Sequence, residues 1–384
     1  KDITFNSTAP SELVSTDGKH VGLLGLLWDS KEDIIMVDIG ELYLGKRKRG
    51  KSPEIIEDDL TGKLAKQFTR RIIVGKVASV YDPLGLLTPV TAKYKLQLHD
   101  LCGKKLDWDD RIPEEYFNTW LNNIEEMQTL GDIRFPRSVV PSDAANLKIS
   151  YIISSDASEE IAITSVHSRM LKTDGTYHVQ LIMAKSKIIT NLTVPRAELK
   201  GMVMGASLGH CITRCTEDRL DEVVHVTDSA ICLYWLKQDQ RPLQTGVRNA
   251  VLEIRRLTDL DSWYHIESAE NVADIGTRRT VQPDMSPNSD WVSGKDWMKT
   301  SGAQMPLKTL EEISLNSADK KLAAQETKNK DIGGIVLHNL KTKVSERLSY
   351  TKYLVDPTRL PWQGTLKAVA IAFRFIDTCL KKVC

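Results

Sequence analysis

The sequence of 384 residues lacks several features that would assign it quickly to a class of proteins. No stretch holds enough uncharged apolar residues to span a bilayer, so we expect no membrane-spanning helix. Neither sign of charge is in excess, because 52 Lys and Arg face 51 Asp and Glu; any contact with a polyanion must therefore come from local basic patches. The six cysteines have no regular spacing, which argues against disulfides and indicates a reducing compartment.

Two catalytic signatures are also missing. A reverse transcriptase carries its aspartates in a Tyr-x-Asp-Asp turn, and neither Asp58-Asp59 nor Asp109-Asp110 has that tyrosine. A retroviral-type aspartic peptidase needs Asp-Thr/Ser-Gly. The chain has Asp-Ser only at positions 29, 228 and 261 and Asp-Thr only at 377, and none of these precedes Gly. The chain is therefore not expected to synthesise DNA, and an aspartic peptidase has little support.

Four acidic residues between positions 147 and 279 lie at expected strand ends and helix starts. Asp156 ends an alternating run from Leu147, Glu198 follows the helix start at Thr193 and Pro195, Asp228 ends the apolar run from Val223, and Asp274 follows an N-cap at Asn271. Taken singly, each could be a turn residue or a partner of a helix dipole. Taken in this order, they predict one site at one edge of a sheet. Four carboxylates there would repel one another unless cations bound them, and oxygen ligands suit Mg²⁺ or Mn²⁺.

The order of these residues and elements resembles the ribonuclease H fold of reverse-transcribing elements. The motifs at Val194–Leu199, Thr227–Ser229 and Glu270–Arg278 resemble the BEL/Pao class of LTR retrotransposons, whose Pol polyprotein would contain this fragment. The segment Val80–Val90, Tyr-Asp-Pro-Leu-Gly-Leu-Leu-Thr-Pro-Val after Val80, is similar to the segment catalogued as the Pao retrotransposon peptidase family. The resemblance implies an α/β and α+β multidomain chain built around a ribonuclease H-like mixed five-stranded sheet with flanking helices.

Four regions follow from the patterns and the resemblance. Residues 1–60 would end a reverse transcriptase palm, with strands at Val21–Asp29 and Asp33–Ile39. Residues 61–135 would form a helical thumb or connection, in which the Val80–Val90 segment joins two helices and Trp108 and Trp120 are core residues. Residues 136–285 would form the ribonuclease H-like domain. Residues 286–384 would be a linker, flexible over Ser314–Asp331, and a helix from about Gly364 leading toward an absent integrase domain. The chain starts without Met or a signal peptide and ends inside an amphipathic pattern, so we expect both ends to be cuts in a longer polyprotein.

The resemblance implies an endonuclease that hydrolyses the RNA strand of RNA–DNA hybrids with two metal ions, Mg²⁺ or Mn²⁺. Asp156 would bridge both ions, Glu198 and Asp228 would complete one, and Asp274 the other. Further expectations are phosphate contacts from Ser229 and Arg278 and from the basic run Lys46, Arg47, Lys48 and Arg49, and a product-release role for His265. The expected partners are the hybrid and the rest of Pol, including the palm and the integrase, with no membrane. The expected location is intracellular, in a cytoplasmic retroelement particle or the nucleus.

Two alternatives remain open from the sequence. The chain could be a retroelement-derived fragment that binds nucleic acid or protein without cleaving, although all four carboxylates are present. It could also be a Pao-type aspartic peptidase, which the missing Asp-Thr/Ser-Gly disfavours. Metal-dependent cleavage of a labelled hybrid, or a casein digest sensitive to pepstatin, separates these interpretations.

Overall fold

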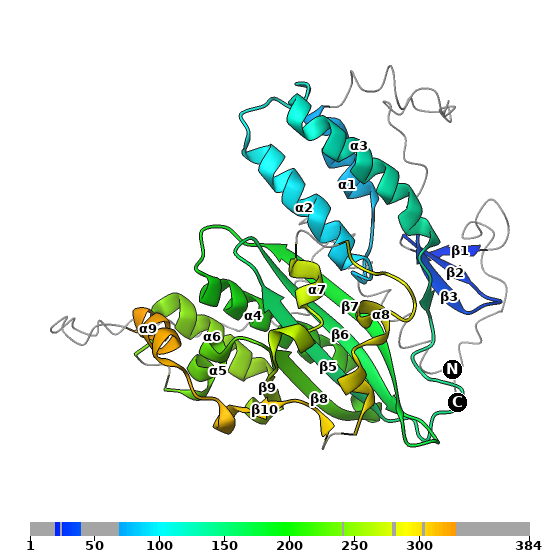
Figure 1. Cartoon of the computed structure of the whole chain (residues 1–384). Coiled ribbons are helices and arrows are strands. Elements are labelled where there is room, and N and C mark those ends of the chain that lie inside the picture. Colours follow the sequence, from blue (N-terminus) through cyan, green and yellow to red (C-terminus); the bar gives the residue numbers. More distant parts are fainter. Residues whose placement is uncertain are drawn as a thin grey trace, which may run out of the picture.

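A computed structural model describes residues 20–23, 25–39, 69–239, 242–278, 282–301 and 304–327. Its centre is a mixed sheet with strand order β10-β9-β8-β5-β6-β7 (Figure 1). The strands are β5 Ile149–Ala157, β6 Ile161–Leu171, β7 Tyr177–Ile188, β8 Leu220–Thr227, β9 Trp263–His265 and β10 Lys308–Thr309. Strands β5, β6 and β7 are antiparallel, while β8 and β9 run parallel to β5. The predicted mixed sheet is confirmed, with the two-residue β10 as a sixth, edge strand.

Helix α4 (Val194–Cys215) covers one face of this sheet. Its small residues Gly201, Gly205 and Gly209 allow a close approach, since a Cβ built on Gly209 would lie 2.6 Å from Ile153 Cδ1. Glycine weakens a helix by about 1 kcal/mol relative to alanine, so this stripe exchanges helix stability for contact with the sheet. Helices α5 (Ala230–Lys237) and α6 (Thr245–Leu257) share an apolar core with α4.

The other face of the sheet is covered by short helices, α7 (Asp274–Thr277) and α8 (Asp290–Ser293). A Cβ on Gly276 of α7 would lie 2.6 Å from Ile163 Cδ1, and Ile163 pairs with Asp156. Because successive strand residues point to opposite faces, α7 and α4 lie on opposite sides of β5 and β6. Trp291 of α8 is fully buried, and its carbonyl accepts a 2.9 Å hydrogen bond from Nε2 of His167.

The helical region contains α1 (Arg70–Ser79), α2 (Thr88–Gly103) and α3 (Glu114–Thr129), which Figure 1 shows above the sheet. The Val80–Val90 segment joins α1 to α2, as expected, and also contacts the sheet. Its Asp82 carboxylate accepts the backbone N–H groups of two residues in its own turn, at 3.0 and 2.7 Å. Ala184 of β7 donates its N–H to the carbonyl of Leu84 at 2.8 Å. Trp291 donates its indole N–H to the carbonyl of Leu86 at 2.9 Å. The segment therefore binds the helical region to the outer strand of the sheet.

A second, small sheet has the order β1-β2-β3-β4, with β1 His20–Leu23, β2 Leu26–Asp29, β3 Ile34–Val37 and β4 Phe135–Pro136. The prediction of one strand over Val21–Asp29 is wrong. Gly25 has a φ of +80°, which glycine adopts at little cost, and the chain turns there into a hairpin.

Two further expectations are corrected. Trp108 is 46% exposed, with the guanidinium of Arg70 4.6 Å from its ring centre, whereas Trp120 is buried as expected. The segment Ser314–Asp331, expected to be a flexible linker, contains helix α9 (Ser317–Gln325), capped by Asn316.

Side-chain contacts fix helix α9 to the rest of the domain. Trp235 donates to the carbonyl of Ala323 at 3.4 Å, and Arg196 forms an ion pair with the buried Glu326 at 2.6 Å. Residues up to Thr327 therefore belong to the same folded body as the sheet, beyond the boundary expected at residue 285. The basic run Lys46–Arg49 and the helix expected from Gly364 lie outside the described residues. None of the helices in the described ranges has the length and apolar character needed to traverse a bilayer.

Candidate active site

The four predicted carboxylates come to one edge of the large sheet. Asp156 lies near the end of β5, and Asp228 follows the parallel strand β8, whose Thr227 pairs with Ser155. Parallel neighbours end at the same edge, which brings these two aspartates together.

The other two carboxylates come from helices on opposite faces. Glu198 lies on α4, where a Cβ on the nearby Gly201 would lie 3.1 Å from the backbone oxygen of Asp156. Asp274 is the first residue of α7. Besides burial, the charges of Asp228 and Asp274 raise the pKa of Asp156, and those of Asp228 and Asp156 raise the pKa of Glu198.

Each carboxylate is held by a hydrogen-bond donor of its own. Thr277 donates its hydroxyl to Asp156 at 2.5 Å, Ser229 donates to Glu198 at 2.5 Å, Asn271 donates its amide to Asp228 at 3.3 Å, and Arg278 forms an ion pair with Asp274. Thr277 was not among the predicted site residues. Its position one helical turn after Asp274 was the available signal, because residues three apart lie on the same face of a helix.

Burial and mutual repulsion shift two of the carboxylates. Burial, with the charge of Asp228 as a smaller contribution, raises the pKa of Asp156 to about 6, and the hydrogen bond from Thr277 opposes this rise. Burial likewise raises the pKa of Glu198 to about 7, against the hydrogen bond from Ser229. A cation would stabilise the negative charge that is concentrated at this partly desolvated edge of the sheet.

The Ser229 side chain is buried and makes its hydrogen bonds within the protein. It is 4% exposed, caps helix α5 by accepting the N–H of Cys232 at 3.3 Å, and donates to Glu198. It therefore orients a carboxylate, a role different from the predicted phosphate contact. Arg278 is half exposed beside Asp274 and remains a candidate for phosphate.

His265 ends strand β9, as its sequence context predicted. Its Nε2 lies 3.1 Å from the backbone oxygen of Asp228, and burial lowers its pKa. The histidine thus contacts the site through the backbone of one of the four acidic residues.

The donor set suits a hard divalent cation, since all four side chains offer carboxylate oxygens. Among the described residues, no group of three His, Cys, Asp or Glu side chains stands in a metal-ligand arrangement. The hydrogen bonds from Thr277, Ser229, Asn271 and Arg278 hold the carboxylates individually instead. A cavity of about 540 Å³ adjoins the site and is lined in part by Asn271, Asp274 and Arg278.

Residues 69–229 match the model of a family described as the Pao retrotransposon-like RNaseH-like domain. This range includes Asp156, Glu198 and Asp228, and it contains the whole Val80–Val90 segment. The family description names a ribonuclease H-like domain for that segment, where the sequence resemblance had named a peptidase family. No curated protein matches the chain.

Solved structures of a ribonuclease H and of a protease-reverse transcriptase resemble parts of the chain at low identity. RNase H1 from Halobacterium salinarum NRC-1 matches 33% of this chain and 90% of its own, at 16% identity and a TM-score of 0.23. The foamy viral protease-reverse transcriptase in complex with an RNA/DNA hybrid matches 72% of this chain at 12% identity and a TM-score of 0.33. This chain covers 31% of that protein. The resemblance stated from the sequence is confirmed over residues 69–229, which match the Pao retrotransposon-like RNaseH-like domain.

Proposed function

We propose that the chain is the ribonuclease H of a BEL/Pao-type Pol polyprotein and hydrolyses the RNA strand of RNA–DNA hybrids. The observation that carries this proposal is the convergence of Asp156, Glu198, Asp228 and Asp274 from both faces of the sheet onto one edge. The family match supports the fold that this chemistry uses.

In the proposed reaction, the protein provides carboxylate oxygens as ligands for metal ions and binds the substrate phosphate. Two divalent cations, when bound, would activate a water and stabilise the leaving oxygen of an in-line displacement. Asp156 interacts electrostatically with the other three acidic residues and would serve both ions, Glu198 and Asp228 would serve one, and Asp274 the other. Thr277 and Ser229 would fix the directions in which Asp156 and Glu198 present their oxygens, and Arg278 would contact the phosphate.

The remaining regions fit the same proposal. The helices α1 to α3 would form the thumb or connection of a reverse transcriptase, and the small sheet β1 to β4 would end its palm. The partners would be the RNA–DNA hybrid and the rest of the polyprotein, and the site of action a retroelement particle.

The test is cleavage of a hybrid labelled separately on each strand. We expect Mg²⁺-dependent endonucleolytic cuts in the RNA strand only, no cuts in single-stranded RNA, and none with EDTA. Asp156→Asn should abolish the cuts, while the matched control Asp174→Asn, in the exposed β6–β7 turn, should retain them. A readout without cleavage is the melting temperature, which Mg²⁺ or Mn²⁺ should raise in the wild type and not in Asp156→Asn.

One observation favours a second candidate. The four carboxylates already have protein donors, as they would in a retroelement-derived fragment that binds hybrids without cleaving them. Hybrid binding with no cleavage and no metal-dependent rise in melting temperature would select that candidate.

A further inference from the structure

Strand β7 places basic residues beside a residue that is in register with Asp156. Ser186 of β7 pairs with Ile163 of β6, and Ile163 pairs with Asp156 of β5. Lys185 and Lys187 stand on either side of Ser186. Two strand spacings of about 4.8 Å therefore separate this segment from the Asp156 backbone by about 10 Å.

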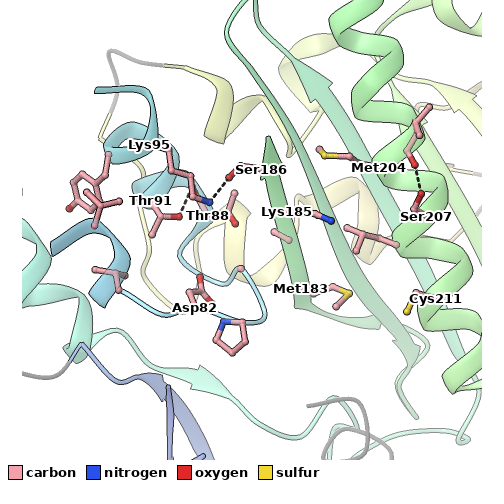
Figure 2. Close-up of a pocket in the computed structure, with 18 residues that line it drawn as sticks. Asp82, Thr88, Thr91, Lys95, Met183, Lys185, Ser186, Met204, Ser207 and Cys211 are labelled. Carbon is pink, nitrogen blue, oxygen red and sulfur yellow. Dashed lines mark hydrogen bonds between the residues drawn. The ribbon is translucent and has the colours of Figure 1, made fainter. Parts of the chain in front are cut away.

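Helix α2 adds a third ammonium group to the same row. Lys95 crosses from the helical region and donates its Nζ to the hydroxyl of Ser186 at 2.9 Å. Figure 2 shows this hydrogen bond, with Lys185 directed from β7 toward the side of α4. Lys95, Lys185 and Lys187, called here the β7 lysine edge, thus come from two parts of the fold that are distant in sequence.

A cavity separates the α2 side of the β7 lysine edge from its α4 side. A cavity of about 600 Å³ lies between α2, β7 and α4, and both Lys95 and Lys185 line it (Figure 2). Its walls are largely apolar, with Val77 on one side and Met204 on the other. Among the described residues, this cavity separates the two ammonium groups, and both lysines are exposed and accessible to a large polar partner.

The carboxylate that faces Lys95 belongs to Asp82 and already accepts hydrogen bonds from the backbone. Asp82 lines the same cavity and attracts Lys95, but its two oxygens accept the backbone N–H groups of Leu86 and Leu87. Within the described ranges, no Asp or Glu forms an ion pair with Lys95, Lys185 or Lys187. By contrast, Lys93 on the same helix pairs with Glu126 at 2.7 Å.

We propose that the β7 lysine edge binds backbone phosphates of the nucleic acid whose scissile phosphate lies at the four carboxylates. The proposal rests on the proposed function. A nucleic-acid strand rises about 3.4 Å per nucleotide, so a separation of about 10 Å corresponds to about three nucleotides. Lysine suits this role because its ammonium acts as a point charge toward phosphate oxygens. Lys95 would make the helical region a direct participant in holding the substrate.

The experiment compares two triple variants of the full chain in equilibrium binding of a hybrid, in EDTA, over a range of salt concentrations. The first carries Lys95→Ala, Lys185→Ala and Lys187→Ala. The control removes the same charge at exposed lysines elsewhere, with Lys31→Ala, Lys105→Ala and Lys148→Ala. Melting temperatures of both variants verify that they fold.

We expect the salt slope of the first variant to flatten by about 2 to 3, the value for loss of that many phosphate contacts, and that of the control to stay near wild type. In cleavage assays, KM should rise while kcat at saturating hybrid stays the same, and Lys95→Arg should keep wild-type KM. Hybrids with methylphosphonates about three nucleotides from the cut, in either the RNA or the DNA strand, identify which backbone is held. Only methylphosphonates in the strand that contacts the β7 lysine edge should reproduce the rise in KM and the flatter salt slope.

Equal salt slopes for the two triple variants would overturn the proposal, even if the chain cleaves hybrids. An equal loss of affinity for polyglutamate would also overturn it and assign the edge to an acidic protein partner. A flattened slope in a chain that cleaves nothing would support the edge and count against the proposed ribonuclease H activity, so the two failures are distinguishable.

Discussion

Replacing Asp156 with Asn should stabilise the metal-free protein at neutral pH. The Asp156 carboxyl is buried near the charges of Asp228 and Asp274, which raises its pKa from 3.8 to about 6. Its ionisation is therefore unfavourable in the folded chain. Asparagine removes the charge and keeps an oxygen that can accept the hydroxyl of Thr277.

The magnitude follows from the pKa. One pKa unit corresponds to about 1.4 kcal/mol, so ionising Asp156 costs the folded state about 3 kcal/mol at pH 7.5. The new amide N–H needs an acceptor, which offsets about 1 to 2 kcal/mol of that gain. A net gain of about 1 to 2 kcal/mol raises the melting temperature of a body of this size by about 2 to 8 °C.

The sign of the pH dependence is set by the raised pKa. Below pH 3.8 the carboxyl is protonated in both the folded and the unfolded chain, and the penalty is absent. As pH rises through about 6, the folded chain loses that proton and the penalty becomes complete. The difference in melting temperature between Asp156→Asn and wild type should therefore open between pH 4 and pH 7.

The assay is thermal unfolding of both proteins in EDTA at pH 4.5 and pH 7.5, repeated with Mg²⁺. The matched control is Asp174→Asn, which should lower the melting temperature at pH 7.5. Asp174 accepts both the N–H and the hydroxyl of Thr176, which lower its pKa to about 2 and make its charge favourable. A lower melting temperature for Asp156→Asn than for wild type in EDTA at pH 7.5, or a gap independent of pH, would refute the reasoning.

Three other predictions can be checked with the same preparations. Ser229→Ala should raise the pKa of Glu198 further and so move the acid limb of the pH–rate profile to higher pH. Loss of the α5 cap should also lower the free energy of unfolding by about 1 kcal/mol. An acid limb at the wild-type pH would mean that the hydroxyl does not act on Glu198. Gly85→Ala should destabilise the chain by several degrees, because φ is +71° and the added Cβ would overlap the carbonyl of Ala184, whereas Gly75→Ala in α1 meets open space and should gain about 0.5–1 kcal/mol; equal melts would contradict the described turn. The chain should extend no primer on any template with Mg²⁺ or Mn²⁺, since the polymerase aspartates are not in the sequence, and any incorporation of labelled nucleotide would disprove this.

Much of the large sheet could be predicted because its strands carry strong local patterns. The alternating run before Asp156 and the apolar run before Asp228 became β5 and β8, and α4 begins near Thr193 and Pro195 as expected. The carboxylates could be grouped for the same reason, since strand ends and helix starts meet at sheet edges.

The elements that were missed depend on contacts between distant residues. Helix α9 has few apolar residues, and its stability comes from the Asn316 cap and the Trp235 hydrogen bond to Ala323, which local periodicity does not contain. Thr277 became a site residue only because α7 lies against β6 and brings its hydroxyl to Asp156.

The hydrogen bond from Ala184 to Leu84 has a consequence for handling the protein. An outer strand with free N–H and C=O groups invites pairing with another chain, and natural proteins shield such edges. Here part of that shield comes from a segment that precedes the ribonuclease H-like sheet by about sixty residues. A fragment beginning at residue 136 would uncover the β7 edge and the indole of Trp291, and we expect it to self-associate. A fragment beginning ahead of Thr69 retains the cover and should remain monodisperse.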